Sequence, residues 1–153
     1  MDPSMSTRPP ARFEDIAFAE LRVGKPYRTS YELGLDLVAA FRAAAAPGRN
    51  QIPHVGELVP PAVYSTFRPM FEALGGRMEQ GTIHTHQSVT VATPPARAGD
   101  VLDVEVTVVR AEETADRRRL VEVATEYRHE GRRVCSTRSR YLWGFSAARE
   151  DER

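Results

Sequence analysis

The segment from Arg49 to Glu57 gathers side chains that could transfer protons at neutral pH. It contains Asn50, His54 and Glu57 close together in the chain. Histidine changes its charge near neutral pH, and a neighbouring amide or carboxylate can orient its ring. These residues are therefore candidates for acid–base catalysis, with His54 as the base and Asn50 or Glu57 orienting it. The alternatives are that His54 is a solvated loop residue and that Glu57 only stabilises the start of a helix.

A second pair of histidines, His84 and His86, lies two residues apart in a segment that alternates like a β-strand. Residues at this spacing share one face of a strand, so the pair could approach a common ligand. A zinc site needs a third or fourth ligand, and no Cys or His stands at a suitable spacing to complete one. We therefore expect no metal, and the absence of a Gly-rich phosphate loop argues against a nucleotide cofactor.

The overall composition excludes several classes of protein. The chain has 153 residues with 21 basic and 21 acidic side chains, which argues against nucleic acid as the main partner. No window approaches the roughly 20 apolar residues of a membrane span. The single cysteine, Cys135, and the lack of a secretory signal favour a cytoplasmic protein without disulfides, and we interpret Cys135 as a structural thiol.

The chain length favours one domain with a core of its own. Residues 1–12 are rich in proline and polar side chains, which predicts a disordered tail. Residues 146–153 form a charged tail, and residues 13–145 are expected to form the single domain.

Two helices are expected around the Arg49–Glu57 segment. Residues 34–46 place apolar side chains at helical spacing, and Pro47 and Gly48 end that pattern. Residues 58–74 are apolar on more than one side, which predicts a buried helix that opens at a Pro-Pro pair and stops at Gly75. Pro69 lies inside this run, where a proline bends or splits a helix.

Strand patterns dominate the rest of the chain. A first strand is expected over residues 27–33, and four more follow the second helix at residues 82–91, 101–112, 120–129 and 132–143. Successive strands in meander order with one apolar face predict an antiparallel sheet, whose apolar face the 58–74 helix must cover. A curved antiparallel sheet wrapped around one central helix is the hotdog arrangement, an α+β fold.

Several motifs strengthen this interpretation. They are Val-Gly-Lys-Pro-Tyr at 23–27, Val-Pro-Pro-Ala at 59–62, His-Thr-His-Gln-Ser-Val-Thr-Val at 84–91 and Pro-Ala-Arg-Ala-Gly-Asp-Val-Leu at 95–102. Over roughly residues 20–143 the chain resembles the MaoC-like hotdog dehydratases and hydratases. Within them it resembles the branch that has a Pro-Pro pair before the helix and a His-x-x-Gln in the next strand. The Gly-Asp turn at Gly99 is the most specific of these features.

The resemblance implies an acyl thioester of coenzyme A or acyl carrier protein as substrate, and a homodimer or heterodimer of hotdog chains. It implies reversible hydration of an enoyl thioester, with a base for water and donors for the enolate oxygen. It also implies that the 84–91 strand borders the substrate channel and pairs across the dimer. The substrate-binding residues it implies are Val59, Pro61 and Ala62 at the helix start and His84 and Gln87 on that strand. The alternative for His84 and Gln87 is that they only fill a mixed face of the sheet at the dimer interface.

The catalytic motif departs from the family pattern. Active members carry Asp-x-Asn-Pro-x-His, and here the corresponding loop reads Gly48-Arg49-Asn50-Gln51-Ile52-Pro53-His54, with no Asp and one extra residue. Three hypotheses follow: a hydratase or dehydratase that uses His54, a non-catalytic subunit that shapes the acyl channel of a heterodimer, and a thioesterase that uses Glu57.

Overall fold

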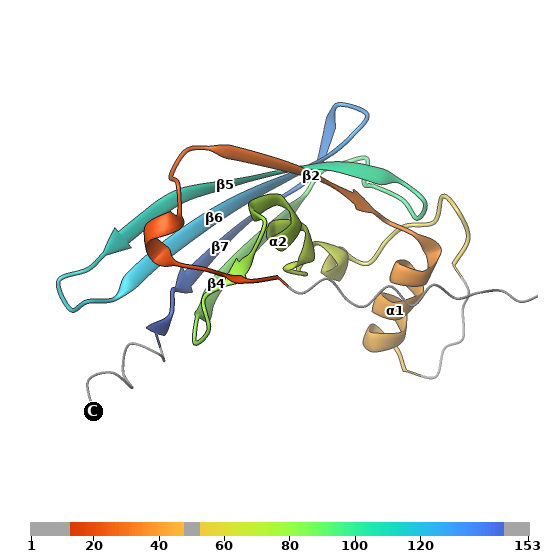
Figure 1. Cartoon of the computed structure of the whole chain (residues 1–153). Helices are drawn as coiled ribbons and strands as arrows, with labels where there is room; N and C mark the ends of the chain where they lie inside the picture. The colour runs from red at the N-terminus through yellow and green to blue at the C-terminus, as the bar shows by residue number, and fades with distance from the viewer. Residues whose placement is uncertain (1–12, 48–52, 146–153) are drawn as a thin grey trace, which may run out of the picture.

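A five-stranded antiparallel sheet forms the body of the molecule in the computed structural model, which describes residues 13–47 and 53–145 (Figure 1). The predicted tails, 1–12 and 146–153, and residue Asn50 lie outside the described residues. The strands are β1 (Asp15–Ile16), β2 (Pro26–Glu32), β3 (Arg77–Met78), β4 (Ile83–Val91), β5 (Val101–Glu113), β6 (Arg119–His129) and β7 (Arg132–Leu142). The helical elements are η1 (Phe18–Glu20), α1 (Leu35–Ala45), η2 (Pro61–Tyr64) and α2 (Arg68–Leu74).

The strand order is β2-β5-β6-β7-β4, with every neighbouring pair antiparallel. The expected meander order is therefore correct for β5, β6 and β7 but wrong for β4, which pairs with β7 at the edge of the sheet. The segment 92–100 carries the chain from β4 across to β5. Alternation along a strand indicates which face is buried, but it does not specify which strand lies beside it.

The predicted alternation on β5 is confirmed. Leu102, Val104, Val106 and Val108 are buried with at most 1% exposure, while the intervening side chains are more exposed. Because side chains on a strand point alternately to the two faces, this pattern gives the sheet one apolar face and one polar face. The apolar face forms the core.

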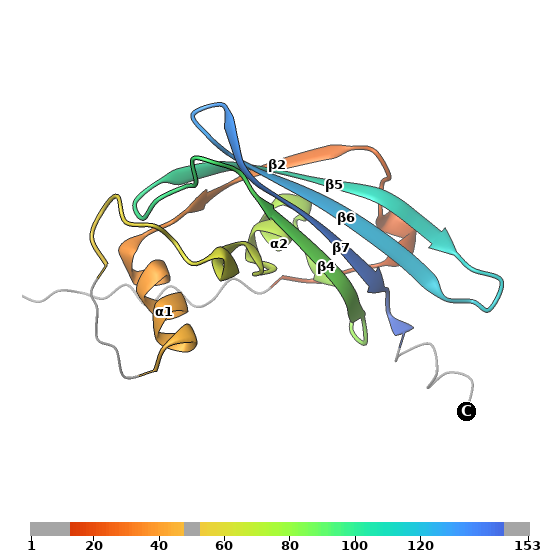
Figure 2. The ribbon, with the colours of Figure 1, turned by 180° about the vertical axis from the view of Figure 1, so that it is seen from behind.

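One face of the sheet carries α2, as Figure 1 shows, and the opposite face, seen in Figure 2, is covered by no described helix. The helix expected over residues 58–74 is split at the proline that indicated a bend or a break: η2 and α2 are separate, with residues 65–67 between them. Pro69 explains the break, because it lies in the first turn of α2, where a missing N–H leaves no hydrogen bond unmade. Gly75 then ends α2 in the left-handed conformation.

The first predicted helix is confirmed as α1, which lies near one end of the sheet (Figure 1). Val38 is fully buried, and Leu37 and Phe41 pack against the core. The N-terminal segment is fixed at the other end, where β1 pairs with β3 and the indole N–H of Trp143 donates to the Ile16 carbonyl at 2.9 Å. No helix in the described part of the chain is long and apolar enough to cross a membrane.

Candidate functional site

The loop that carries His54 is fixed to the turn that precedes β5. The Gly56 N–H donates to the Ala98 carbonyl at 2.8 Å, and the Ala98 N–H donates to the Glu57 carbonyl at 2.7 Å. The Arg97 guanidinium adds a bond to the Gly56 carbonyl at 3.0 Å. The Gly-Asp turn therefore holds the candidate catalytic loop in place.

The turn itself depends on two residues. Asp100 accepts a hydrogen bond from the Arg97 N–H at 2.8 Å, which closes the turn, and its other carboxylate oxygen lies 3.6 Å from the His129 ring nitrogen. Gly99 has a φ of 95°, and a Cβ there would lie 3.2 Å from a Val55 methyl carbon. Glycine is required because the backbone is left-handed and the His54 loop packs directly on it.

His54 is exposed in this loop, and its carbonyl accepts the Glu57 N–H at 3.2 Å. The Glu57 carboxylate is held by Arg42, with 2.6 Å between the nearest oxygen and nitrogen, and Arg42 also donates to the Leu58 carbonyl at 2.9 Å. The Arg42 guanidinium keeps the pKa of Glu57 below its ordinary value. Glu57 is therefore an ionised partner of Arg42, an arrangement that weakens it as a base.

The start of η2 has fewer backbone N–H groups than the helix N-terminus that the sequence predicts. Pro60 and Pro61 have no N–H groups, and the Val63 N–H is used by the Pro60 carbonyl at 3.1 Å, so Ala62 carries the first N–H of the turn. Pro61 and Ala62 are exposed, whereas Val59 is half-buried against the core.

The predicted residues on β4 lie on the core face of the sheet, where His84 contacts Phe67 in the segment just before α2. The His84 ring stacks on Tyr141 with 4.9 Å between centroids and meets the Phe67 ring edge-on at 5.4 Å. The Gln87 amide donates to the Ser139 hydroxyl at 3.3 Å. Among the described residues, no hydrogen bond, ion pair or ring contact joins this group to the His54 loop.

The prediction that His84 and His86 share a face is wrong. The register of β4 against β7 shifts between them, so His84 lies opposite Tyr141 and His86 lies opposite Arg140. Since Tyr141 and Arg140 are consecutive residues on β7, they face opposite sides of the sheet, and so do the two histidines. Within the ranges 13–47 and 53–145, no cluster of three or more His, Cys, Asp or Glu side chains could hold a metal ion.

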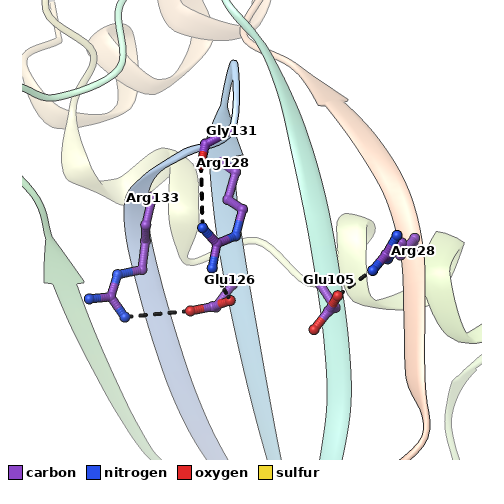
Figure 3. Close-up of polar contacts among 6 residues, drawn as sticks. All are labelled: Arg28, Glu105, Glu126, Arg128, Gly131 and Arg133. Atoms are coloured by element: carbon purple, nitrogen blue, oxygen red, sulfur yellow. Dashed lines mark hydrogen bonds and ion pairs between the residues drawn. The ribbon is translucent and has the colours of Figure 1, made fainter.

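The uncovered face of the sheet carries ion pairs instead of a catalytic constellation (Figure 3). Glu105 pairs with Arg28 at 3.2 Å, and Glu126 pairs with Arg128 at 3.0 Å and with Arg133 at 3.4 Å. These side chains are a third or more exposed, and such pairs contribute about 1 kcal/mol or less to stability. This face therefore presents a solvated surface on which both glutamates are paired with arginines.

Sequence reasoning missed two groups of residues near the site. Arg42, which orients Glu57, stands on α1, and no local motif links it to the loop. Thr125, Thr137 and Ser139 are buried polar residues on the α2 side of the sheet. A signal for the latter was present, because small polar residues occupy inward positions of β7 where β5 has valine and leucine.

Comparisons with known proteins address the fold. No protein-family model and no curated protein sequence matches this chain. Solved structures do match, among them the (R)-hydratase from A. caviae involved in PHA biosynthesis, at 22% identity and a TM-score of 0.56, with 80% of this chain and 97% of that chain covered. The MaoC-like dehydratase from Rhodospirillum rubrum matches at 18% identity and a TM-score of 0.58, with coverages of 84% and 97%.

A third match is the C-terminally truncated HadBC complex, a 3R-hydroxyacyl-ACP dehydratase from Mycobacterium tuberculosis. It has 15% identity and a TM-score of 0.52, with 78% of this chain and 95% of that chain covered. At such identities the likeness shows the fold. The chain therefore has the hotdog fold. Its structural neighbours with this fold include MaoC-like dehydratases and (R)-hydratases.

Proposed function

We propose that this chain is a MaoC-like hydratase or dehydratase of enoyl or 3-hydroxyacyl thioesters, carried on coenzyme A or acyl carrier protein, with His54 as its general base. The observation that carries the proposal is the position of His54, exposed in a loop that the Gly-Asp turn holds just before η2. Structural likeness to an (R)-hydratase and to hydroxyacyl-thioester dehydratases supports the same class of reaction.

In the proposed hydration, a His54 ring nitrogen accepts a proton from water as the water oxygen bonds to the β-carbon of the enoyl group. The π electrons move toward the thioester, whose oxygen becomes an enolate. The Ala62 N–H, the first of η2, is the proposed donor to that oxygen. The α-carbon then takes the proton from His54, which returns to its neutral form, and dehydration is the reverse.

The proposed acyl-binding residues are Val59 and Pro61 beside Ala62, together with His84 and Gln87 on β4. One edge of β4 is unpaired within the described chain, because β4 is the last strand of the sheet. We propose that a second hotdog chain, identical or different, pairs there and brings its own loop to the β4 side chains. The protein is proposed to act in the cytoplasm, as the sequence composition predicts.

The test is hydration of crotonyl-CoA, followed as loss of the enoyl absorbance, by the wild type, His54→Ala and His86→Ala. His86 is the matched control, because it is also an exposed histidine but lies on the opposite face of β4 from His84. Loss of a general base lowers kcat/KM by about 10²–10⁴-fold, which we expect for His54→Ala. Equal rates for the wild type and His54→Ala would remove His54 from the mechanism.

A second candidate is a non-catalytic subunit that shapes the acyl channel of a heterodimer. It is favoured by the engagement of Glu57 with Arg42, since among the described residues no hydrogen bond or ion pair joins a carboxylate to the His54 ring. This candidate predicts no turnover by the chain alone and turnover once a partner hotdog chain with an Asp and a His is added. A kcat of about 1 per second or more from the isolated chain excludes it.

A further inference from the structure

A continuous polar patch lies on the core face of the sheet, beneath α2. It consists of Gln87 on β4, Thr137 and Ser139 on β7, and Thr125 on β6. Strand register places Thr125 opposite Thr137 and Gln87 opposite Ser139, so the four side chains are neighbours on one face. On β5 the same face carries only valine and leucine from Leu102 to Val108. These four polar residues therefore lie on the three strands from β6 to β4.

Three of these four side chains are deeply buried, and Gln87 is half-buried. Thr125 is 6% exposed, Thr137 is 8% exposed and Ser139 is 6% exposed. Neither threonine hydroxyl makes a hydrogen bond to another residue in the part of the chain that the structure describes, whereas Ser139 accepts one from Gln87. The threonine hydroxyls keep some accessible surface, since among the described residues only the Tyr64 hydroxyl and one Glu79 carboxylate oxygen are fully enclosed without a hydrogen-bond partner.

The hydroxyl-bearing residues line a small cavity. The four polar residues line it together with side chains from η2, α2 and the segment between them, including Tyr64, Thr66, Phe67 and Met70. Its volume is ≈ 10 Å³, which is room for about one water molecule. A group the size of a single hydroxyl or water can therefore bind there and pair with the threonines.

The cavity also lies next to the proposed thioester-binding segment. Tyr64, which lines it, is the last residue of η2, and Ala62, the proposed donor to the thioester oxygen, lies two residues earlier in the same turn. At about 2 Å of rise per residue in a 3₁₀-helix, this separation is about 4 Å along the axis. The proposed thioester donor and a residue that lines the cavity are therefore close together in the same turn.

We propose that this cavity is a specificity subsite that receives the end of a short acyl chain and selects a terminal hydroxyl group over a methyl group. The inference rests on the proposed function, because it assumes that the thioester binds at the start of η2. Gln87, Thr125 and Thr137 hydrogen-bond the terminal hydroxyl, and the water-sized volume excludes longer chains.

Binding measurements test the subsite without requiring catalysis. Isothermal titration of the full chain with butyryl-CoA and with 4-hydroxybutyryl-CoA gives two dissociation constants. We expect the hydroxylated thioester to bind roughly tenfold more tightly, as one buried hydrogen bond allows. The variant with Thr125→Val and Thr137→Val keeps the shape of the cavity, and we expect it to lose this preference while it binds butyryl-CoA as well as the wild type does. Thr90→Val, an exposed threonine of β4, is the matched control and should keep the preference.

The possible failures are distinguishable. Equal affinities for the two thioesters, or a preference that survives in the double variant, would overturn the subsite while leaving the proposed function intact, and the cavity would then hold only a water. If neither thioester binds, the proposed function and the subsite both fail. Circular dichroism of the double variant establishes that it is folded before its affinities are compared.

Discussion

Replacing each of two buried tyrosines with phenylalanine should change the free energy of unfolding in opposite directions. The Tyr31 hydroxyl donates to the Val63 carbonyl at 2.8 Å. The Tyr64 hydroxyl is buried and has no hydrogen-bond partner among the described residues. Burial raises the pKa of both phenols, that of Tyr31 to about 12, so both stay neutral over the working range of pH. Replacing each tyrosine with phenylalanine therefore isolates the hydrogen bond.

The expected magnitudes follow from these contacts. Tyr31→Phe leaves a buried carbonyl unpaired, which should lower the free energy of unfolding by about 1–2 kcal/mol. Tyr64→Phe removes an unpaired buried hydroxyl, which should raise that free energy by about 1 kcal/mol or leave it unchanged. The two variants should therefore differ by roughly 2 kcal/mol.

Urea denaturation followed by circular dichroism measures this difference. At slopes of about 1–3 kcal/mol per molar urea, the two midpoints should be separated by roughly 1 M. Unchanged slopes would show that the variants unfold in the same way as the wild type. If Tyr64→Phe is destabilised as much as Tyr31→Phe, the Tyr64 hydroxyl has a partner and the reasoning is refuted.

Two further predictions concern the loop that carries His54. Gly99→Ala should lower the melting temperature more than Gly131→Ala, because both glycines have positive φ but only Gly99 has Val55 within contact distance; equal losses in differential scanning calorimetry would argue against this packing. Arg42→Gln should lower the melting temperature at pH 7, and its deficit relative to the wild type should shrink as the pH falls below about 4. The pKa of Glu57 is depressed in the folded state, so the stability from its pair with Arg42 is present above the unfolded pKa and is lost as Glu57 is protonated. A deficit of the same size at pH 3 and pH 7 would contradict this role of the ion pair.

Patterns with a clear period made much of this fold predictable. The strands from β4 to β7 and the helix α1 lie within one or two residues of their predicted bounds, because alternation and helical spacing are read directly from apolar side chains. Pro69 indicated the split of the central helix. Because proline has no N–H, it is placed in the first turn of α2. The two-residue strands β1 and β3 are too short to show any period.

Long-range arrangement was harder to predict. The pairing of β4 with β7 depends on a connection that crosses the sheet, and the alternation of β4 is compatible with either neighbour. The register shift between His84 and His86 leaves the sequence pattern unchanged, yet it sends the two rings to opposite faces. Tertiary contacts of this kind also join Arg42 to Glu57.

The candidate site was predicted in part. His54 and Glu57 were chosen from residue type, and the structure adds that the loop is fixed by Ala98 and that Glu57 is engaged by Arg42. The catalytic role of His54 stays a prediction. The polar cavity beneath α2 was not foreseen, because an inward threonine on a strand resembles valine in shape and differs only in its hydroxyl.

The most direct test of the account is the turnover number of the purified chain with crotonyl-CoA as the only substrate. A hydratase that uses His54 predicts a kcat of about 1 per second or more, together with a loss of at least about 100-fold in His54→Ala. Hydration no faster than in buffer would contradict the proposal that this chain is itself the catalyst. That result would favour the hypothesis that this hotdog chain is a non-catalytic subunit.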